Sequence, residues 1–231
     1  MKRSKLYKSR MAAYDRGLAY SLEDAVSVLK SMPKPKFDES IDVAFKLGID
    51  TRQSDQNVRG AVTLPNGTGK NIKVVVVADG DAAEAAKNAG ADEVGSSELI
   101  EKIKGGWTDF DVLIATPAAM KDVRTLGRVL GPRGLMPNPK TGTVTDDTAK
   151  AVSESKAGRV EFRADKGGAT HMPLGKVSFE VSKLVENAET AISAILKARP
   201  ASTKGNYVLS CTISATMSPG VKIDLKDIVK V

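Results

Sequence analysis

The chain has 231 residues, of which 41% are hydrophobic and 27% charged, so it has enough apolar side chains for a buried core and is not disordered throughout. Its net charge of +7 favours a polyanionic partner such as nucleic acid. A single cysteine excludes an internal disulfide and a zinc cluster built on thiolates.

Membrane and secretory classes are also disfavoured by the sequence. Its apolar segments are all shorter than the roughly 20 residues of a membrane span. The basic start is interrupted at Asp15 and Arg16 before an apolar signal-peptide core can form. We therefore expect a cytoplasmic protein with no membrane partner.

The first flank of the chain is predicted to form a helix followed by two strands. Apolar residues recur at helical spacing over 22–29. Over 41–50, apolar and polar side chains alternate, which is the pattern of a half-buried strand. Residues 58–64 are a second candidate strand. Such a sheet needs a helix layer on its apolar face.

The middle of the chain has a different pattern. Residues 73–79 and 111–116 contain uninterrupted apolar runs, typical of parallel strands buried on both faces. Helices are predicted over 81–89, over 97–104 with Ser97 as the cap, and from Pro117 toward residue 130, and Thr145 is predicted to cap another. This alternation of strands and helices predicts a three-layer α/β domain.

The last flank returns to the first pattern. Strands are predicted over 159–163, 177–181 and 207–213, with an amphipathic helix over 184–196 between the last two. His171 is expected in a turn. Cys211 is expected on the core side of the last strand, which makes it a packing residue and not a nucleophile.

Charge divides the chain at the same places as these patterns. Residues 1–66 and 157–231 each carry a net charge of +4, whereas residues 67–156 carry −1. We therefore predict one discontinuous α+β domain, 1–66 plus 157–231, and one inserted α/β domain, 67–156. The turn-rich residues 65–69 and the joint at 157–158 are the expected linkers.

A phosphate-handling enzyme built on the α/β middle is the main alternative. Residues 67–70, GTGK, resemble part of a phosphate-binding loop, but Leu64 replaces its first glycine and Asn71 its serine or threonine. Only Gly80 follows the valine run, so a dinucleotide-binding glycine motif is missing. We predict no catalytic residue, no metal site and no cofactor.

Three segments suit contact with RNA, each with a plainer alternative. The basic arm is a contact or a solvated terminus, and its cations are Lys2, Arg3, Lys5, Lys8, Arg10 and Arg16. Lys34 and Lys36 lie beside Phe37, whose ring can stack on a base or pack in the core. Residues 214–220 form a hydroxyl-rich turn that suits phosphates and 2′-hydroxyls, or simply connects two strands.

Residues 127–145, GRVLGPRGLMPNPKTGTVT, contain four glycines and three prolines. They predict a shaped loop that contacts RNA or protein, or that packs on its own domain.

With these segments the whole chain resembles the ribosomal protein L1 family of the bacterial large subunit. The most specific match is 126–144, LGRVLGPRGLMPNPKTGTV, and KFDESIDVAFKLGID, SDQNVRGAVTLP and TISATMSPG match in order and spacing. The signature residues are Gly127, Arg128, Gly131, Pro132, Arg133, Gly134, Pro137 and Lys140. The resemblance implies an α+β sandwich domain made from both chain ends and an inserted Rossmann-like three-layer α/β domain.

The resemblance also implies a function. It implies a structural constituent of the cytoplasmic large ribosomal subunit, neither an enzyme nor an obligate homo-oligomer. Such a protein binds the mobile rRNA stalk near the tRNA exit site, assists release of deacylated tRNA and represses translation of its own messenger RNA. A protein that is primarily a messenger-binding repressor would use the same surface and is the second alternative.

The rRNA contacts that the resemblance implies, position by position, are Lys36, Phe37, Ser210, Thr216, Met217 and Ser218. Ser218 departs from the family, which usually has glycine there. The signature residues are family markers, and the sequence assigns them no RNA contact.

Overall fold

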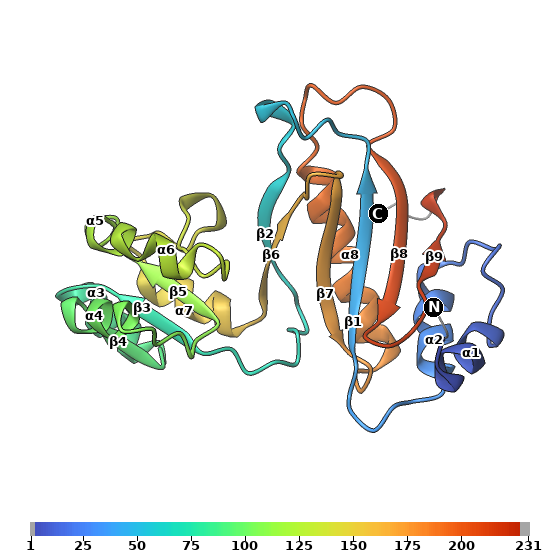
Figure 1. Ribbon diagram of the computed structural model, residues 1–231, viewed down its shortest axis with the longest axis horizontal. Coiled ribbons are helices and arrows are strands. Elements are labelled where there is room, and N and C mark those ends of the chain that lie inside the picture. Colours follow the sequence, from blue (N-terminus) through green and yellow to red (C-terminus); the bar gives the residue numbers. More distant parts are fainter. Residues whose placement is uncertain (1–2, 227–231) are drawn as a thin grey trace. The chain divides into compact units, whose positions relative to one another are not determined.

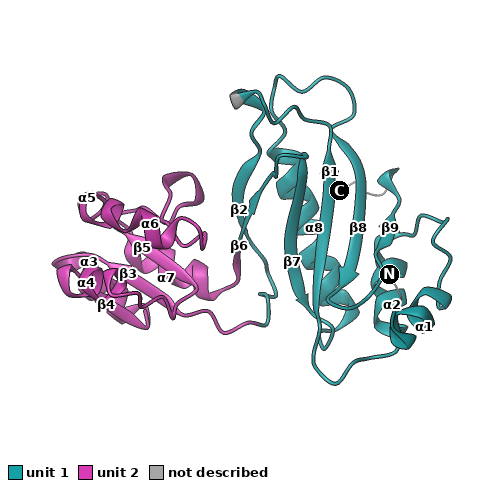
Figure 2. Cartoon of the chain, viewed as in Figure 1, with its two compact units in different colours: residues 1–69, 160–231 teal, residues 70–159 magenta. Residues whose placement is uncertain are grey.

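The computed structural model describes residues 3–226, so Lys2 of the basic arm and residues 227–231 lie outside the described part. Its contacts form two compact units, shown in Figure 2: unit 1 comprises Met1–Gly69 with Val160–Val231, and unit 2 comprises Lys70–Arg159. The domain boundaries at 67 and 156 stay a prediction, because compactness alone does not show that either part folds independently.

Unit 1 is built on a four-stranded antiparallel sheet in the order β7-β1-β8-β9. Helix α8 lies behind the sheet in Figure 1, and α2 packs in the same core, so both helices cover one face of the sheet. The strands are β1 (Ser40–Leu47), β7 (Ala169–Lys176), β8 (Val208–Ala215) and β9 (Val221–Ile223). The helices are α2 (Leu22–Ser31) and α8 (Val181–Lys197).

The alternation in β1 explains this layering. Every second side chain of the strand, beginning with Ile41, is buried in the core shared with α2 and α8. Asp42 and Ala44 are half-buried and Lys46 is exposed on the opposite face. The apolar face therefore determines which side of the sheet the helices cover.

Two smaller elements and a two-stranded ribbon complete the described part of unit 1. These elements are α1 (Lys5–Ala12), the 3₁₀ helix η1 (Ser54–Gln56), β2 (Arg59–Thr63) and β6 (Arg159–Arg163), of which β2 and β6 pair with each other. β6 begins at the last residue of unit 2.

A buried amide joins α8 to the turn that leaves unit 1. Asn187 is fully buried, and its Oδ1 accepts a hydrogen bond from the backbone N–H of Asn66 at 3.1 Å. Its Nδ2 donates to the carbonyl oxygens of Gly67 at 3.0 Å and Leu174 at 2.7 Å. One side chain thus connects α8, β7 and the start of the linker.

Unit 2 has a three-stranded parallel sheet in the order β4-β3-β5 between two helical layers. Its strands are β3 (Val74–Val77), β4 (Glu93–Gly95) and β5 (Val112–Ala115). One layer contains α3 (Asp81–Asn88) and α7 (Thr148–Lys156). The other contains α4 (Ser97–Lys104), α5 (Met120–Val123), η2 (Arg124–Leu126) and α6 (Gly127–Leu130).

The four valines of β3 alternate between the two cores of unit 2. Val74 and Val76 pack with α3 and α7, whereas Val75 and Val77 pack on the other layer. An uninterrupted apolar run is the consequence of burial on both faces. The predicted fold class, α+β in one part and three-layer α/β in the other, is confirmed.

Several predicted elements are wrong in detail. The strand expected over 177–181 is absent from those residues, and β7 lies at 169–176 instead. His171 is therefore on a strand and not in a turn. β7 contains Pro173, and a proline is tolerated there because β7 is an edge strand.

The predicted helix starts also need correction. Ser97 is the first residue of α4, not its cap. α7 is capped by Asp147, whose Oδ1 accepts from the N–H of Lys150 at 3.1 Å, and not by Thr145. The helix predicted from Pro117 is divided into α5, η2 and α6, with Gly127, a poor helix former, at the second junction.

Candidate nucleic-acid interface

Two loops meet at one end of the sheet in unit 1, near the start of β1 in Figure 1. Residues 33–39 connect α2 to β1, and residues 216–220 connect β8 to β9. The N–H of Thr216 donates to the carbonyl of Ser40 at 3.0 Å, and the Thr216 Oγ1 accepts from the N–H of Ser40 at 3.1 Å. The sheet therefore brings together segments about 180 residues apart in sequence.

Both loops expose apolar side chains. Phe37 is 52% exposed and Met217 is 54% exposed, although full burial of either side chain would contribute about 1.5–3 kcal/mol. Lys36, next to Phe37, is exposed as well. The alternative that Phe37 packs in the core is wrong. An accessible ring, a thioether and a cation together suit contact with bases, riboses and phosphates.

Ser218 uses its hydroxyl within its own loop. Its Oγ accepts a hydrogen bond from the N–H of Ala215 at 2.8 Å and donates to the carbonyl of Pro219 at 3.0 Å. The half-buried Ser218 side chain therefore stabilises the turn, and the exposed residues of the loop are Thr216 and Met217. This is how serine is accommodated where the family resemblance implies glycine.

Ser210 does not lie with the other implied contacts. It is exposed on β8 opposite Lys46, so the six residues to Thr216 place it roughly 20 Å along the strand from the two loops. Thr212 and Ser214, at alternate positions between them, are half-buried on the open face. A ligand that touches Ser210 and Thr216 together must run along this face of the sheet.

A buried ion pair supports the two loops. Arg10 Nη2 lies 2.8 Å from Glu39 Oε2, and the two side chains are 1% and 4% exposed. For Arg10 the alternative of a solvated basic terminus is therefore wrong, whereas Arg3, Lys5, Lys8 and Arg16 are exposed. Nothing in the sequence distinguishes Arg10 from these neighbours, and Glu39 was not predicted as part of the site.

The open face of the sheet carries a half-buried carboxyl among cations. Burial raises the pKa of Asp42, and the positive charges of His171 and Lys176 partly oppose that shift. His171, Lys46 and Lys222 are exposed on the outward-facing positions of β7, β1 and β9. The face is therefore polar and carries more positive than negative side chains.

The raised pKa predicts that Asp42→Asn stabilises the fold at neutral pH. The folded state binds the Asp42 proton more tightly than the unfolded chain, so this group stabilises below its ordinary pKa and loses that contribution as pH rises through the raised value. Urea unfolding should show the variant more stable at pH 7 and equal to the wild type below about pH 4. Glu161→Gln, at an exposed site of β6, is the control. A less stable Asp42→Asn protein at pH 7 would contradict this account.

The signature loop of unit 2 packs largely on its own unit. After α6 it leads to the 3₁₀ helix η3 (Pro139–Thr141). Thr141 and Thr143 are buried, and Thr143 Oγ1 accepts from the N–H of Asn138 at 2.8 Å. Gly142 has φ 68°, and a Cβ there would collide with the Arg159 guanidinium. These contacts explain the glycine and threonines without a ligand.

The outer part of this loop presents its signature residues to solvent. Arg133 hydrogen-bonds to Thr108, and the exposed members are Arg128, Gly131, Pro132, Arg133, Gly134 and Lys140, whereas Gly127 is half-buried and Pro137 is buried. An RNA contact by this surface stays a prediction.

The enzyme alternative receives no support from residues 67–70. Gly67 and Gly69 have φ of 65° and 68°, and the next regular element is β3. A phosphate-binding loop needs a helix there, whose N-terminus faces the phosphate.

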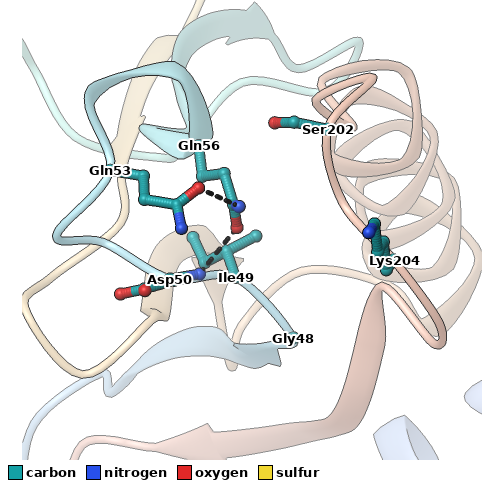
Figure 3. A pocket seen from close by; sticks show the side chains of 7 residues that line it. All are labelled: Gly48, Ile49, Asp50, Gln53, Gln56, Ser202 and Lys204. Atoms are coloured by element: carbon teal, nitrogen blue, oxygen red, sulfur yellow. Dashed lines mark hydrogen bonds between the residues drawn. The ribbon is translucent and has the colours of Figure 1, made fainter.

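A pocket of about 690 Å³ lies at the far end of β1 from Phe37 and is shown in Figure 3. Its side chains hydrogen-bond within the loop 48–56: Gln56 Oε1 accepts from the N–H of Asp50 at 2.8 Å, and Gln56 Nε2 donates to Gln53 Oε1 at 2.8 Å. Its lining residues are Gly48, Ile49, Asp50, Gln53, Gln56, Ser202 and Lys204, which include neither His171 nor Cys211.

Between residues 3 and 226 no group of three or more His, Cys, Asp or Glu could hold a metal ion. Over that same range, no helix has the length and apolarity of a membrane span.

Cys211 lies in the core of unit 1, as the sequence predicted. Burial raises the pKa of its thiol to about 12. Because the thiolate is the reactive form, iodoacetamide at pH 8 should leave the folded protein unlabelled and label it fully in urea, as followed by mass spectrometry. Rapid labelling of the folded protein would show that the thiol is accessible.

The comparison that decides the family covers the 33–39 loop, the signature segment and all but the last residue of the 216–220 loop. A model described as the Ribosomal protein L1p/L10e family matches residues 29–219. The chain belongs to this family. The predicted resemblance to the bacterial L1 proteins is thereby confirmed.

Curated L1 relatives match along nearly the whole chain. The Large ribosomal subunit protein uL1 of Lactiplantibacillus plantarum is 54% identical over 224 residues, 97% of this chain and 98% of its own length. The protein of the same name from Protochlamydia amoebophila is 53% identical, over 97% of this chain and 95% of its own. That of Chlamydia pneumoniae is 51% identical, over 98% of each chain.

Proposed function

We propose that this chain is a structural constituent of the large ribosomal subunit in the cytoplasm, where it binds a folded stalk of the large-subunit rRNA. The observation that carries the proposal is the pair of exposed side chains, Phe37 and Met217, on two loops that hydrogen-bond to each other at one end of the unit 1 sheet. The name of the relatives, Large ribosomal subunit protein uL1, supports the ribosomal assignment.

The chemistry of this end suits folded RNA. Such RNA is recognised through its shape, its phosphates and its 2′-hydroxyls, with aromatic stacking on bases that are not paired. Lys36 supplies a cation for a phosphate, Thr216 a hydroxyl, and Phe37 a ring for stacking. Because both loops are held by internal hydrogen bonds, little conformational entropy is lost when RNA binds.

The open face of the sheet extends the same surface. Lys46 provides positive charge there, His171 presents an exposed imidazole, and Ser210 lies at its far end. A stalk that lies on the two loops and continues along this face would reach all six residues implied by the family resemblance. The proposed interface is therefore elongated and lies within unit 1.

Two finer roles belong to the same proposal. As part of a mobile stalk near the exit site, the protein assists release of deacylated tRNA. By binding a similar RNA structure in its own messenger, it represses its own translation. If one surface serves both RNAs, unlabelled messenger fragment should displace the labelled stalk fragment completely, and partial displacement would indicate separate sites.

The main test is binding to a stalk-containing rRNA fragment and to a scrambled RNA of equal length over a range of salt concentrations. Specific recognition should persist as salt rises, while the logarithm of the binding constant falls with a slope that reports the phosphates contacted. Equal affinities for the two RNAs that collapse together with salt would overturn the proposed function.

A further inference from the structure

The N-terminal helix α1 is attached to the proposed interface by one buried side chain. Arg10 is the buried residue of this helix, whereas Leu6 and Tyr7 are half-buried and its other cations are exposed. The Arg10 guanidinium donates from Nε to the carbonyl of Pro33 at 2.8 Å. It also donates from Nη1 and Nη2 to the two carboxylate oxygens of Glu39 at 2.9 and 2.8 Å.

These bonds close the loop that carries Lys36 and Phe37. Pro33 and Glu39 are the first and last residues of the 33–39 loop, so one guanidinium binds both of its ends. The intervening residues project from this closed base and are largely exposed. A planar group with five N–H donors in fixed directions suits this task, because it can reach a carbonyl and both oxygens of a carboxylate together.

The same carboxylate fixes the second loop. Glu39 Oε1 accepts a hydrogen bond from the backbone N–H of Met217 at 2.9 Å, in addition to the one from Arg10. Met217 is one residue beyond the paired backbone of Thr216 and Ser40. Arg10, Glu39 and the Met217 amide therefore form one connected set of hydrogen bonds, of which those between Arg10 and Glu39 are buried and the one from Met217 is part-buried.

We propose that Arg10 is a positioning residue for RNA binding, which holds Phe37 and Met217 in place without touching RNA itself. This inference rests on the proposed function. It gives α1 a task beyond that of a basic arm: the helix anchors the two loops through a buried ion pair whose charges cancel, so the contribution of Arg10 to RNA affinity does not come from its charge.

Two variants separate positioning from folding. Arg10→Lys keeps the charge, but an ammonium cannot reproduce the three directed bonds. Arg10→Met combined with Glu39→Gln removes both buried charges, so it avoids the unpaired ion that destabilises single replacements. It also leaves an amide oxygen that can accept from the Met217 N–H. Lys8→Met, on the exposed side of α1, removes a charge and is the matched control.

The first readout uses the full-length protein without RNA. Hydrogen exchange followed by NMR should show the Met217 amide exchanging at least about tenfold faster in Arg10→Lys than in the wild type or Lys8→Met, since its acceptor is no longer held. Amides in the centre of β1 should be unchanged. Equal protection of Met217 in the wild type and Arg10→Lys would overturn the inference.

The second readout is affinity for the stalk fragment. Both Arg10 variants should bind roughly tenfold more weakly, because the 33–39 loop, no longer closed at Pro33 and Glu39, must be ordered on binding. The salt dependence for Arg10→Lys should match that of the wild type. Unchanged affinity in both variants would overturn the positioning role, even with faster exchange at Met217.

Wild-type protein that does not distinguish stalk from scrambled RNA would overturn the proposed function, and the role of Arg10 in RNA binding with it. That failure is visible in the wild-type measurement alone. The exchange rates would then still decide whether Arg10 orders the loops.

Discussion

Replacing Phe37 and Met217 together by alanine should weaken binding to the rRNA stalk by roughly 1–3 kcal/mol for each base that is stacked in the complex. In the folded protein without RNA, both side chains are more than half exposed, so they make few contacts that alanine would remove. The free energy of unfolding should therefore change by less than about 0.5 kcal/mol. The measurement pairs filter binding or calorimetry with urea unfolding of the same protein.

Leu18→Ala is the matched control for this double variant. Leu18 is a large apolar side chain, 57% exposed, that lies outside both loops. It should alter neither RNA affinity nor stability. If the double variant binds the stalk as tightly as the wild type does, the two loops are not the interface. If it unfolds at room temperature, the two side chains belong to the core.

Asn187→Leu should destabilise the protein by roughly 1–3 kcal/mol. The leucine fills a similar volume but leaves the N–H of Asn66 and the carbonyl oxygens of Gly67 and Leu174 without the partner they have now. A buried polar group left unpaired costs about 1–3 kcal/mol, and of these three bonds the one to Leu174 is buried while the other two are part-buried. Urea unfolding followed by circular dichroism measures the loss.

Glu189→Ala, on the exposed side of α8, is the comparison for Asn187. It should change stability by less than about 0.5 kcal/mol. A loss below about 1 kcal/mol for Asn187→Leu would mean that water or a rearranged turn satisfies the three backbone groups. The linker would then not depend on this amide.

The sequence correctly predicted the elements in which the spacing of apolar residues matches the faces that are buried. The alternation in β1 and the valine run of β3 each follow from which faces are covered. β7 was misplaced because its proline and glycine disfavour a strand except at a sheet edge, and edge position depends on the whole topology. β4, with three residues, is too short to show any period.

In the candidate site, too, some residues were predicted from the sequence and others were not. Phe37 was singled out by its position beside Lys34 and Lys36 and Met217 by its hydroxyl-rich turn, and the family resemblance then named both as contacts, but no local pattern shows that they are exposed or adjacent. Arg10 and Glu39 lie 29 residues apart, and the Met217 amide lies 178 residues beyond Glu39. Such pairings are created by the tertiary fold, so composition and periodicity carry no sign of them.

The position of β1 in the sheet also has a consequence for the order of events during synthesis. β1 pairs with β7 on one side and β8 on the other. Both partner strands are synthesised more than 120 residues after β1, so β1 stays unpaired until then. Unit 2 is contiguous and leaves the ribosome complete before them. A nascent chain that has not reached residue 217 presents the 33–39 loop without its companion. The surface proposed to bind RNA is thus among the last parts of the molecule to be completed, and an unfinished chain lacks one of its two loops.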